Sequence, residues 1–247
     1  MSFVKITRPA AQQQEVTFFC FSPPVMIATF LIEISLAAYT LWRYKLTPVS
    51  RLIICILFGL AIFQLAEYNV CQGAAGAAVP WSRIGYVAIT FLPPLGLHLL
   101  FAIAGVKKRL YVWAAYVAGV AFAAFFLLAP GAMDGHACLG NYVIFQVAKN
   151  SGAMFGAYYY VLLAIAVIMG IKFYHTSRAT EQKRAISGLI FGYLVFIVPT
   201  ILVNLLSPNT VRGIPSIMCG FAVLLALTLG FVTLPATVAK KKGNQHD

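Results

Sequence analysis

Three side chains that can gain or lose a proton near neutral pH lie well inside long hydrophobic segments: Glu33, Glu67 and His98. A charged side chain at the centre of a bilayer costs roughly 2.5–3.5 kcal/mol on insertion scales, so such positions are functional candidates by default. Carboxyl and imidazole groups can accept and release protons and can form hydrogen bonds. This chemistry suits a proton relay, a ligand contact or a polar coupling between helices.

Glu33 and His98 fall at similar depths if their segments are helices that cross a membrane. With a rise of about 1.5 Å per residue, both lie several ångströms from the midpoint of their segments, toward the same side. We therefore expect this intramembrane polar pair to face the bundle interior and to meet, directly or through water or a polar neighbour. The alternative is that each group is neutral and hydrogen-bonded to a nearby backbone carbonyl.

A second polar group gathers toward the opposite side of the membrane. Gln64 and Glu67 are three residues apart and share a helix face with Tyr68 close by, and Arg83 begins the next hydrophobic segment at the same level. Two interpretations remain open: a buried salt bridge between Glu67 and Arg83, or the polar rim of a ligand-binding pocket. Asn204, near the same end of a later segment, is a further candidate for that rim.

Several chemistries are disfavoured by the same residues. Glu67 and His98 differ in depth, which argues against a metal site built from them and Glu33. The last hydrophobic segment has no lysine for a retinal Schiff base, and only one histidine lies within a segment, so a bis-histidine haem is excluded. P-loop, HExxH, paired CxxC and GxSxG motifs are absent. We expect no metal, no cofactor and no enzymatic activity.

Composition identifies the elements that must position these residues. Of the 247 residues, 61% are hydrophobic and only 10% are charged, so the chain cannot fold as a soluble domain with a polar surface. At roughly 20 residues per crossing, the segments that qualify are Phe18 to Trp42, Leu52 to Cys71, Trp81 to Gly105, Leu110 to Pro130, a segment within Asn150 to Tyr174, Ala185 to Leu206, and Ile214 to Val238. The predicted fold is an all-α membrane protein, a seven-transmembrane helix bundle that forms one domain over residues 1–247.

Basic residues set the orientation of the bundle. Thirteen of the 18 Lys and Arg residues lie in the connections after the first, third and fifth segments and after the last one. The positive-inside rule then puts the N-terminal segment 1–17 outside and the basic tail 239–247 in the cytoplasm. The net charge of +12 therefore indicates topology and contact with anionic lipid headgroups, and we expect no nucleic-acid partner.

Cysteines and prolines add two structural expectations. Cys71 and Cys138 both face the oxidising side in this orientation, and a disulfide between them would tether a long outer loop over the mouth of the bundle. Cys20 is the competing partner, while Cys55 and Cys219 are interpreted as small apolar fillers. Prolines at 93, 94, 199 and 235 interrupt the helical hydrogen bonds. The last two are expected to kink or end their helices, and the Pro93–Pro94 pair to pack against other helices or a cavity.

The segments around Glu67 and His98 resemble a known family. A polar, Glu-containing end of the second segment is followed by Trp81 and Arg83, then by Phe91-Leu92-Pro93 and by Leu97-His98. Over residues 18–130 this pattern is similar to the N-terminal seven-helix membrane region of bacterial sensor histidine kinases. The resemblance implies a sensory input module in the bacterial cytoplasmic membrane, which passes a helix movement to a cytoplasmic output.

The sequence ends at KKKGNQHD, directly after the seventh segment, so a cytoplasmic output is expected from a separate protein partner. The favoured hypothesis is a receptor-like membrane sensor without its own catalytic domain, which takes a small-molecule or lipid ligand. One alternative is a transporter or proton-conducting protein that uses Glu33 and His98 as relay sites, although no internal repeat is visible. Another is an accessory subunit of a larger membrane complex.

Overall fold

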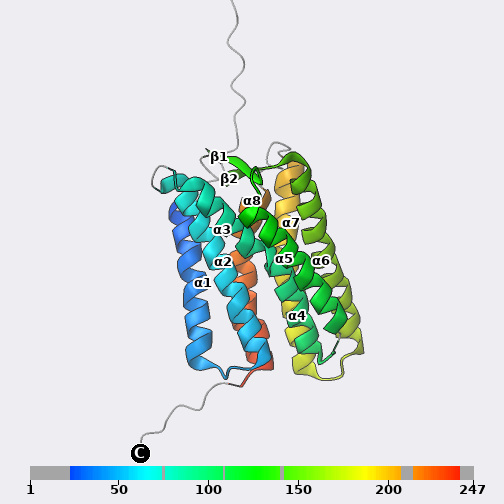
Figure 1. Cartoon of the computed structure of the whole chain (residues 1–247). Helices are drawn as coiled ribbons and strands as arrows, with labels where there is room; N and C mark the ends of the chain where they lie inside the picture. The colour runs from blue at the N-terminus through cyan, green and yellow to red at the C-terminus, as the bar shows by residue number, and fades with distance from the viewer. Residues whose placement is uncertain (1–22, 74–75, 108, 140–141, 207–213, 240–247) are drawn as a thin grey trace, which may run out of the picture.

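The computed structural model describes residues 23–73, 76–107, 109–139, 142–206 and 214–239, and these form a helical bundle with a short β-hairpin at one end (Figure 1). In chain order the elements are α1 (Pro23–Arg43), α2 (Pro48–Gln72), α3 (Ala78–Thr90), α4 (Leu92–Ala104), α5 (Arg109–Leu128), β1 (Met133–Leu139), β2 (Tyr142–Val147), α6 (Lys149–Thr176), α7 (Thr180–Leu206), α8 (Ile214–Thr228), a π-helical turn (Leu229–Thr233) and α9 (Leu234–Thr237).

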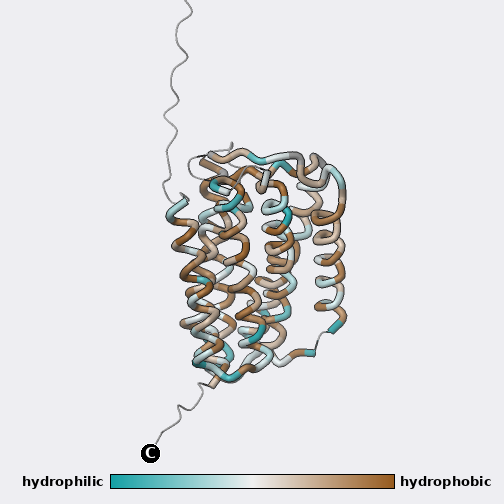
Figure 2. Tube along the Cα trace, turned by 60° about the vertical axis from the view of Figure 1, so that its left-hand side comes forward, coloured by the Kyte–Doolittle hydropathy of each residue, from teal (hydrophilic) through white to brown (hydrophobic). Residues whose placement is uncertain are grey.

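Within the described residues, seven helical segments are long and apolar enough to cross a membrane. The helices α3 and α4 together make one of them, Ala78–Ala104, and the π-helical turn joins α8 and α9 into another, Ile214–Thr237. Hydrophobic residues predominate along the helices in Figure 2. The predicted seven-span helical fold is confirmed at this level, and the chain has the architecture of a multi-pass membrane protein. The first five residues of the first predicted span, 18–22, lie outside the described residues.

The α3–α4 break follows from the proline pair. Neither Pro93 nor Pro94 has a backbone N–H, so both fit the first turn of a new helix better than the middle of an existing one. Accordingly α4 restarts after Phe91, and both prolines are buried. Helix α5 packs against Pro94 at Gly119, where an added Cβ would lie 3.5 Å from the Pro94 side chain. The expectation that this pair packs against neighbouring helices is confirmed.

The other two prolines behave differently from each other. Helix α7 continues through Pro199 to Leu206, so this proline does not end it. Pro235 is the second residue after the π-helical turn, in the first turn of α9. Because proline has no N–H, it leaves a carbonyl in the preceding turn without its usual i→i−4 partner, at the point where the helix is wider than an α-helix. The last span is therefore interrupted near its end, as expected.

Helix α2 lies at the centre of the bundle and carries several of the candidate residues. It contacts α1, α3, α4, α8 and α9 as well as β1. Its start is fixed by a capping box, in which the Thr47 side chain accepts the Ser50 N–H and the Ser50 hydroxyl accepts the Thr47 N–H. Its central face is fully buried and apolar, with Ile53, Leu57 and Phe63 in the core. The position of α2 is thus well determined at both its start and its middle.

The β-hairpin was not predicted. The sequence indicates an outer loop, PGAMDGHACLGNY, and then a segment, NYVIFQVAK, that forms a short interfacial turn or extends the fifth span. Strands β1 and β2 pair antiparallel, with Cys138 opposite Val143 and Leu139 opposite Tyr142. The β2 sequence YVIFQV is rich in β-branched and aromatic residues, which favour extended backbone. We call the end of the bundle where β1 and β2 lie the hairpin end (Figure 1). The opposite end, where α9 finishes in Figure 1, is called the basic end; it holds the α1–α2, α4–α5 and α6–α7 connections.

Candidate functional site

An open cavity of about 790 Å³ lies at the hairpin end, bordered by β1, β2, α3, α6 and α8. Its volume falls within the range of small-molecule sites. No lining side chain is charged; the wall consists of Tyr86, Ile89, Ala137, Ile144, Phe145, Gln146, Val147, Gly152, Ala153, Phe155, Gly156, Tyr159, Tyr160, Ile214, Pro215, Met218 and Cys219. Gln146, Gly152 and Ala153 are exposed, so the cavity opens to the surface beside the start of α6.

Small residues on α6 create much of this space. A Cβ added to Gly152 or Gly156 would meet no atom within 4 Å. In contrast, a Cβ on Gly170, further along the same helix, would lie 2.9 Å from Ile190 of α7. The first turns of α6 therefore stand away from their neighbours where the later turns pack closely against α7.

Aromatic rings form the inner wall of the cavity. The Tyr86 ring lies 5.4 Å from the Phe145 ring and 5.5 Å from the Phe155 ring, centroid to centroid. The Phe155 and Tyr159 rings are 5.9 Å apart. Such rings offer large, rigid apolar faces that prefer another ring edge-on or offset-stacked. Because a charged ligand would find no described counter-charge in this wall, the cavity suits an uncharged molecule with an aromatic ring.

Behind the cavity wall lies a cluster of buried polar groups, which we call the acid cluster: Glu33, Gln64, Glu67 and Ser216. The Ser216 side chain is hydrogen-bonded to the Glu67 carboxyl group. Gln64 donates from Nε2 to the backbone oxygen of Cys219 at 2.9 Å. Both Glu33 oxygens and one Glu67 oxygen have no hydrogen-bond partner among the described residues. The two carboxyl groups are close enough to affect each other electrostatically.

The acid cluster is connected to the cavity through two routes. Tyr86 and Cys219 line the cavity and also lie within electrostatic range of Glu67. Ser216, which bonds to Glu67, accepts the backbone N–H of Val143 in β2 at 3.2 Å. A ligand that moves β2 or the start of α8 would therefore disturb the hydrogen bond to a fully buried carboxyl group.

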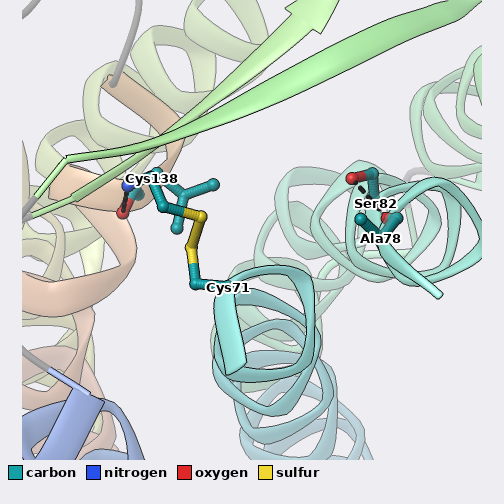
Figure 3. The surroundings of a disulfide bond; sticks show 6 residues. Cys71, Ala78, Ser82 and Cys138 are labelled. Carbon is teal, nitrogen blue, oxygen red and sulfur yellow. Dashed lines mark hydrogen bonds between the residues drawn. A yellow bond between two sulfur atoms is a disulfide. The ribbon is translucent and has the colours of Figure 1, made fainter. Parts of the chain in front are cut away.

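A disulfide fixes the hairpin above the cavity. Cys71 at the end of α2 is bonded to Cys138 of β1, with a Cα–Cα distance of 5.8 Å (Figure 3). The predicted pair is confirmed, and the competing partner Cys20 lies outside the described residues. Cys55 and Cys219 are free thiols. Cys219 is buried like a small apolar residue, but it also forms part of the cavity wall.

Arg83 does not pair with Glu67. Its guanidinium donates to the carbonyls of Leu127 and Ala129, the latter at 3.3 Å, where α5 ends. A cation at a helix C-terminus satisfies carbonyls that have no partner within the helix and interacts favourably with the helix dipole. The salt-bridge interpretation is therefore wrong, because the carbonyls at the end of α5 already occupy Arg83.

The remaining ligand-binding candidates lie outside the cavity wall. Gln64 and Glu67 belong to the acid cluster, and Tyr68 is half-buried against the apolar core at the hairpin end. Neither these three nor Arg83 lines the cavity. Asn204 is in α7, but its side chain lies outside the described residues. The residues that do line the cavity are mostly apolar, and an intramembrane search for polar side chains could not have found them.

Glu33 and His98 were expected to meet directly or through water or a polar neighbour, and no direct hydrogen bond joins them among the described residues. His98 Nδ1 lies 3.3 Å from the hydroxyl oxygen of Tyr116 in α5, whereas the Glu33 oxygens have no hydrogen-bond partner among the described residues. Glu33 instead lies near Glu67 of α2 and Cys219 of α8. Glu33 is fully buried and His98 is half-buried, and the rotation of each helix about its axis turns the two side chains toward different neighbours.

No protein-family model matches the chain, and no curated protein matches it in sequence. In the part of the chain that the structure describes, no group of three or more His, Cys, Asp or Glu side chains is arranged to hold a metal ion. Function is therefore inferred from the cavity and the acid cluster.

Proposed function

We propose that this chain is a receptor-like membrane protein that binds an uncharged aromatic molecule in the cavity at the hairpin end. The observation that carries the proposal is the cavity itself: about 790 Å³, walled by five aromatic side chains and free of charged groups. Ligand sites are characteristically apolar concavities of this size with a few polar groups. The small α6 residues that open the cavity also sacrifice packing at that position, which a purely structural bundle has no reason to do.

The distribution of basic residues supports an outward-facing site. Lys and Arg concentrate at the basic end, which the positive-inside rule assigns to the cytoplasm. The hairpin end would then face the exterior, where disulfides persist. A ligand would enter from outside or from the outer leaflet of a bacterial cytoplasmic membrane.

The proposed output is a movement of α8, passed to a separate protein partner. Helix α8 begins in the cavity wall at Ile214 and leads through the π-helical turn to α9 at the basic end. π-Helical turns in otherwise regular helices often occur at functional positions. The resemblance of residues 18–130 to the membrane region of sensor histidine kinases supports the same direction of signalling.

Filling the cavity tests the proposal. We would reconstitute the protein in lipid nanodiscs and measure thermal unfolding with and without 2-isopropylnaphthalene, an uncharged aromatic probe. Binding to the native state raises the unfolding temperature. The wild type should be stabilised, and Gly156→Leu should be stabilised less because its side chain projects into the cavity and takes up part of its volume.

The matched control is Ala164→Leu, on an exposed face of the same helix. It adds three carbons without entering the cavity, so its response to the probe should equal that of the wild type. Equal stabilisation of all three proteins would mean that the probe acts through the bilayer, and would refute the cavity as a binding site.

A proton-conducting function is the second candidate, favoured by the unpartnered carboxyl oxygens of the buried Glu33–Glu67 pair. Carboxyl groups inside membrane bundles are frequent members of proton relays. Liposomes that contain the protein would dissipate an imposed pH gradient faster than empty ones, and Glu33→Gln would abolish the difference. Dissipation at the rate of empty liposomes would rule this function out.

A further inference from the structure

A second, smaller cavity lies directly behind the large one. It offers about 20 Å³ to the centres of water-sized molecules and shares Tyr159, Met218 and Cys219 with the wall of the large cavity. Its far side is formed by residues of α2, α4 and α7, including Gly96 and Tyr193. We call it the inner cavity. It continues the line from the hairpin end toward the middle of the bundle.

Tyr193 stands out among the groups that line the inner cavity. Its side chain is 4% exposed, and its hydroxyl has no hydrogen-bond partner among the described residues. Two other tyrosines near the cavities have one: Tyr158 donates to the Thr90 carbonyl at 2.8 Å, and Tyr160 to the Met218 sulfur at 3.4 Å. A buried hydroxyl without a partner is unfavourable, so its retention calls for an explanation.

Gly96 makes room for this hydroxyl. A Cβ at position 96 would overlap the Tyr193 hydroxyl oxygen, so any side chain there would displace it from the inner cavity. The α4 backbone and the α7 tyrosine thus fit each other only because position 96 is glycine. The Tyr193 hydroxyl therefore lies in a mostly apolar wall without a partner among the described residues, and it can donate one hydrogen bond to a group that enters the inner cavity.

Water alone is a poor partner for this group. The inner cavity has room for about one water molecule, and a buried water is usually held by two to four polar groups. Most of this wall is aliphatic, with Ile56, Leu60, Leu163 and Leu189 among its members. A ligand that fills the large cavity and reaches inward with an acceptor oxygen would satisfy the hydroxyl and bury its own apolar body.

We propose that Tyr193 is the hydrogen-bond donor that recognises the ligand, and that the ligand is an uncharged aromatic molecule carrying a carbonyl oxygen at its inner end. The carbonyl occupies the inner cavity, and the aromatic ring lies among the rings of the large one. This proposal rests on the proposed function, because it assumes a ligand in the large cavity. It adds the chemical group that the site selects.

Two probes of nearly equal shape test the proposal. 2-Acetylnaphthalene carries the carbonyl oxygen, and 2-isopropylnaphthalene has a methyl group in its place. Dissociation constants for both would be measured in nanodiscs with the wild type, Tyr193→Phe and Tyr158→Phe. Because the probes partition differently into lipid, the informative quantity is the change in their affinity ratio between variants, from which partitioning cancels.

The affinity ratio is the affinity for the acetyl probe divided by the affinity for the isopropyl probe. It should be about tenfold higher in the wild type than in Tyr193→Phe, because one neutral hydrogen bond contributes about that much. Tyr158→Phe should keep the wild-type ratio, because its hydroxyl bonds to Thr90. Gly96→Ala should lose the preference, since its methyl group displaces the Tyr193 hydroxyl.

Other outcomes would contradict the role of Tyr193, the proposed function, or both. An affinity ratio unchanged in Tyr193→Phe would overturn the role of Tyr193. If the isopropyl probe binds and Gly156→Leu weakens its binding, but the affinity ratio is the same in every variant, the proposed function stands and this inference alone fails. If neither probe binds the wild type, both fail. Tyr193→Phe should unfold at or above the wild-type temperature, because it removes only an unpartnered hydroxyl.

Discussion

Cys138 and Val143 face each other across the two strands of the hairpin, and each connects it to a different helix. Cys138 is bonded to Cys71 at the end of α2. The Val143 amide donates to Ser216 in the first turn of α8, and Ser216 is hydrogen-bonded to Glu67 of α2. The hairpin that covers the cavity is thus attached to α2 in two ways at this cross-strand pair. One is the disulfide, and the other is the chain of hydrogen bonds through Ser216.

Breaking the covalent link should loosen the hairpin and open the cavity. In the double variant Cys71→Ser, Cys138→Ser we expect the unfolding free energy to fall by about 2–4 kcal/mol, as is typical when a disulfide that closes a long loop is removed. Labelling of Cys219 by a small maleimide, quantified by mass spectrometry, should become faster because Cys219 lines the cavity. Cys55→Ser, at an exposed position, is the control. Unchanged labelling of Cys219 would show that the hairpin does not restrict access.

Breaking the hydrogen-bonded link should also destabilise the protein. Ser216→Ala leaves the buried Val143 N–H and one Glu67 oxygen without partners, with an expected cost of about 1–3 kcal/mol. Ser187→Ala removes a hydroxyl that bonds only within its own helix at an exposed site, and should cost less than about 0.5 kcal/mol. Reversible unfolding in mixed micelles would measure both. Equal losses would mean that the Ser216 connection contributes nothing of its own.

The sequence was most informative wherever the bilayer imposes a strict rule. Helices must satisfy their own backbone and must be about 20 residues long to cross a membrane, so hydropathy alone located the seven spans. The pairing of Cys71 with Cys138 followed from the spans, since both cysteines lie at the same end. The break between α3 and α4 was not predicted, although the prolines at 93 and 94 provide a local steric reason for it.

Rotation about the helix axis could not be read in the same way. Glu33 and His98 were placed inside the bundle, but hydropathy has little angular information when every face is apolar. For this reason two contacts were not predicted: His98 lies against Tyr116, and Arg83 binds the end of α5 and not Glu67. Cavities are harder still to predict, because the space beside the glycines at 152 and 156 depends on how far the neighbouring helices stand from α6.

A signal for the hairpin was present and was missed. Gly140-Asn141 is a two-residue turn sequence between segments that can pair, and YVIFQV has the composition of a strand. The search for 20-residue apolar segments led to the interpretation of YVIFQV as part of an interfacial turn or of an extension of the fifth span. Short β-structure at the ends of a bundle has to be sought separately from the spans.

Removing the carboxyl group of Glu33 and removing that of Glu67 should have opposite effects on the stability of the protein. Glu33→Met deletes a buried group that has no partner, and should be neutral or stabilising by up to about 3 kcal/mol. Glu67→Met deletes the partner of Ser216, and should destabilise by about 1–2 kcal/mol. Thermal unfolding of both variants would be compared with Glu181→Gln, at an exposed position. A large loss of stability in Glu33→Met would reveal a partner for Glu33 outside the described residues.

Because Arg83 binds the end of α5 and not Glu67, the two residues should contribute independently to the free energy of unfolding. Arg83→Ala removes two hydrogen bonds to the end of α5 and should cost about 1–3 kcal/mol, and Arg83→Lys should recover only part of that because an ammonium cannot span both carbonyls as a guanidinium does. A double-mutant cycle with Glu67→Gln should give a coupling energy below about 0.5 kcal/mol. A coupling above about 1 kcal/mol would restore the salt bridge that the structure argues against.

The orientation of the bundle decides what kind of ligand can reach the cavity, and it can be tested with cysteine chemistry in cells. In Cys71→Ser, the thiol of Cys138 is free and exposed at the hairpin end. A membrane-impermeant maleimide should label it in intact cells, because the positive-inside rule puts this end outside. Arg178→Cys, exposed in the α6–α7 connection at the basic end, should react only after the membrane is permeabilised. The reverse pattern would turn the cavity toward the cytoplasm. The disulfide would then stand in a reducing compartment, where it could not persist as a structural link, and the ligand would have to be an intracellular molecule.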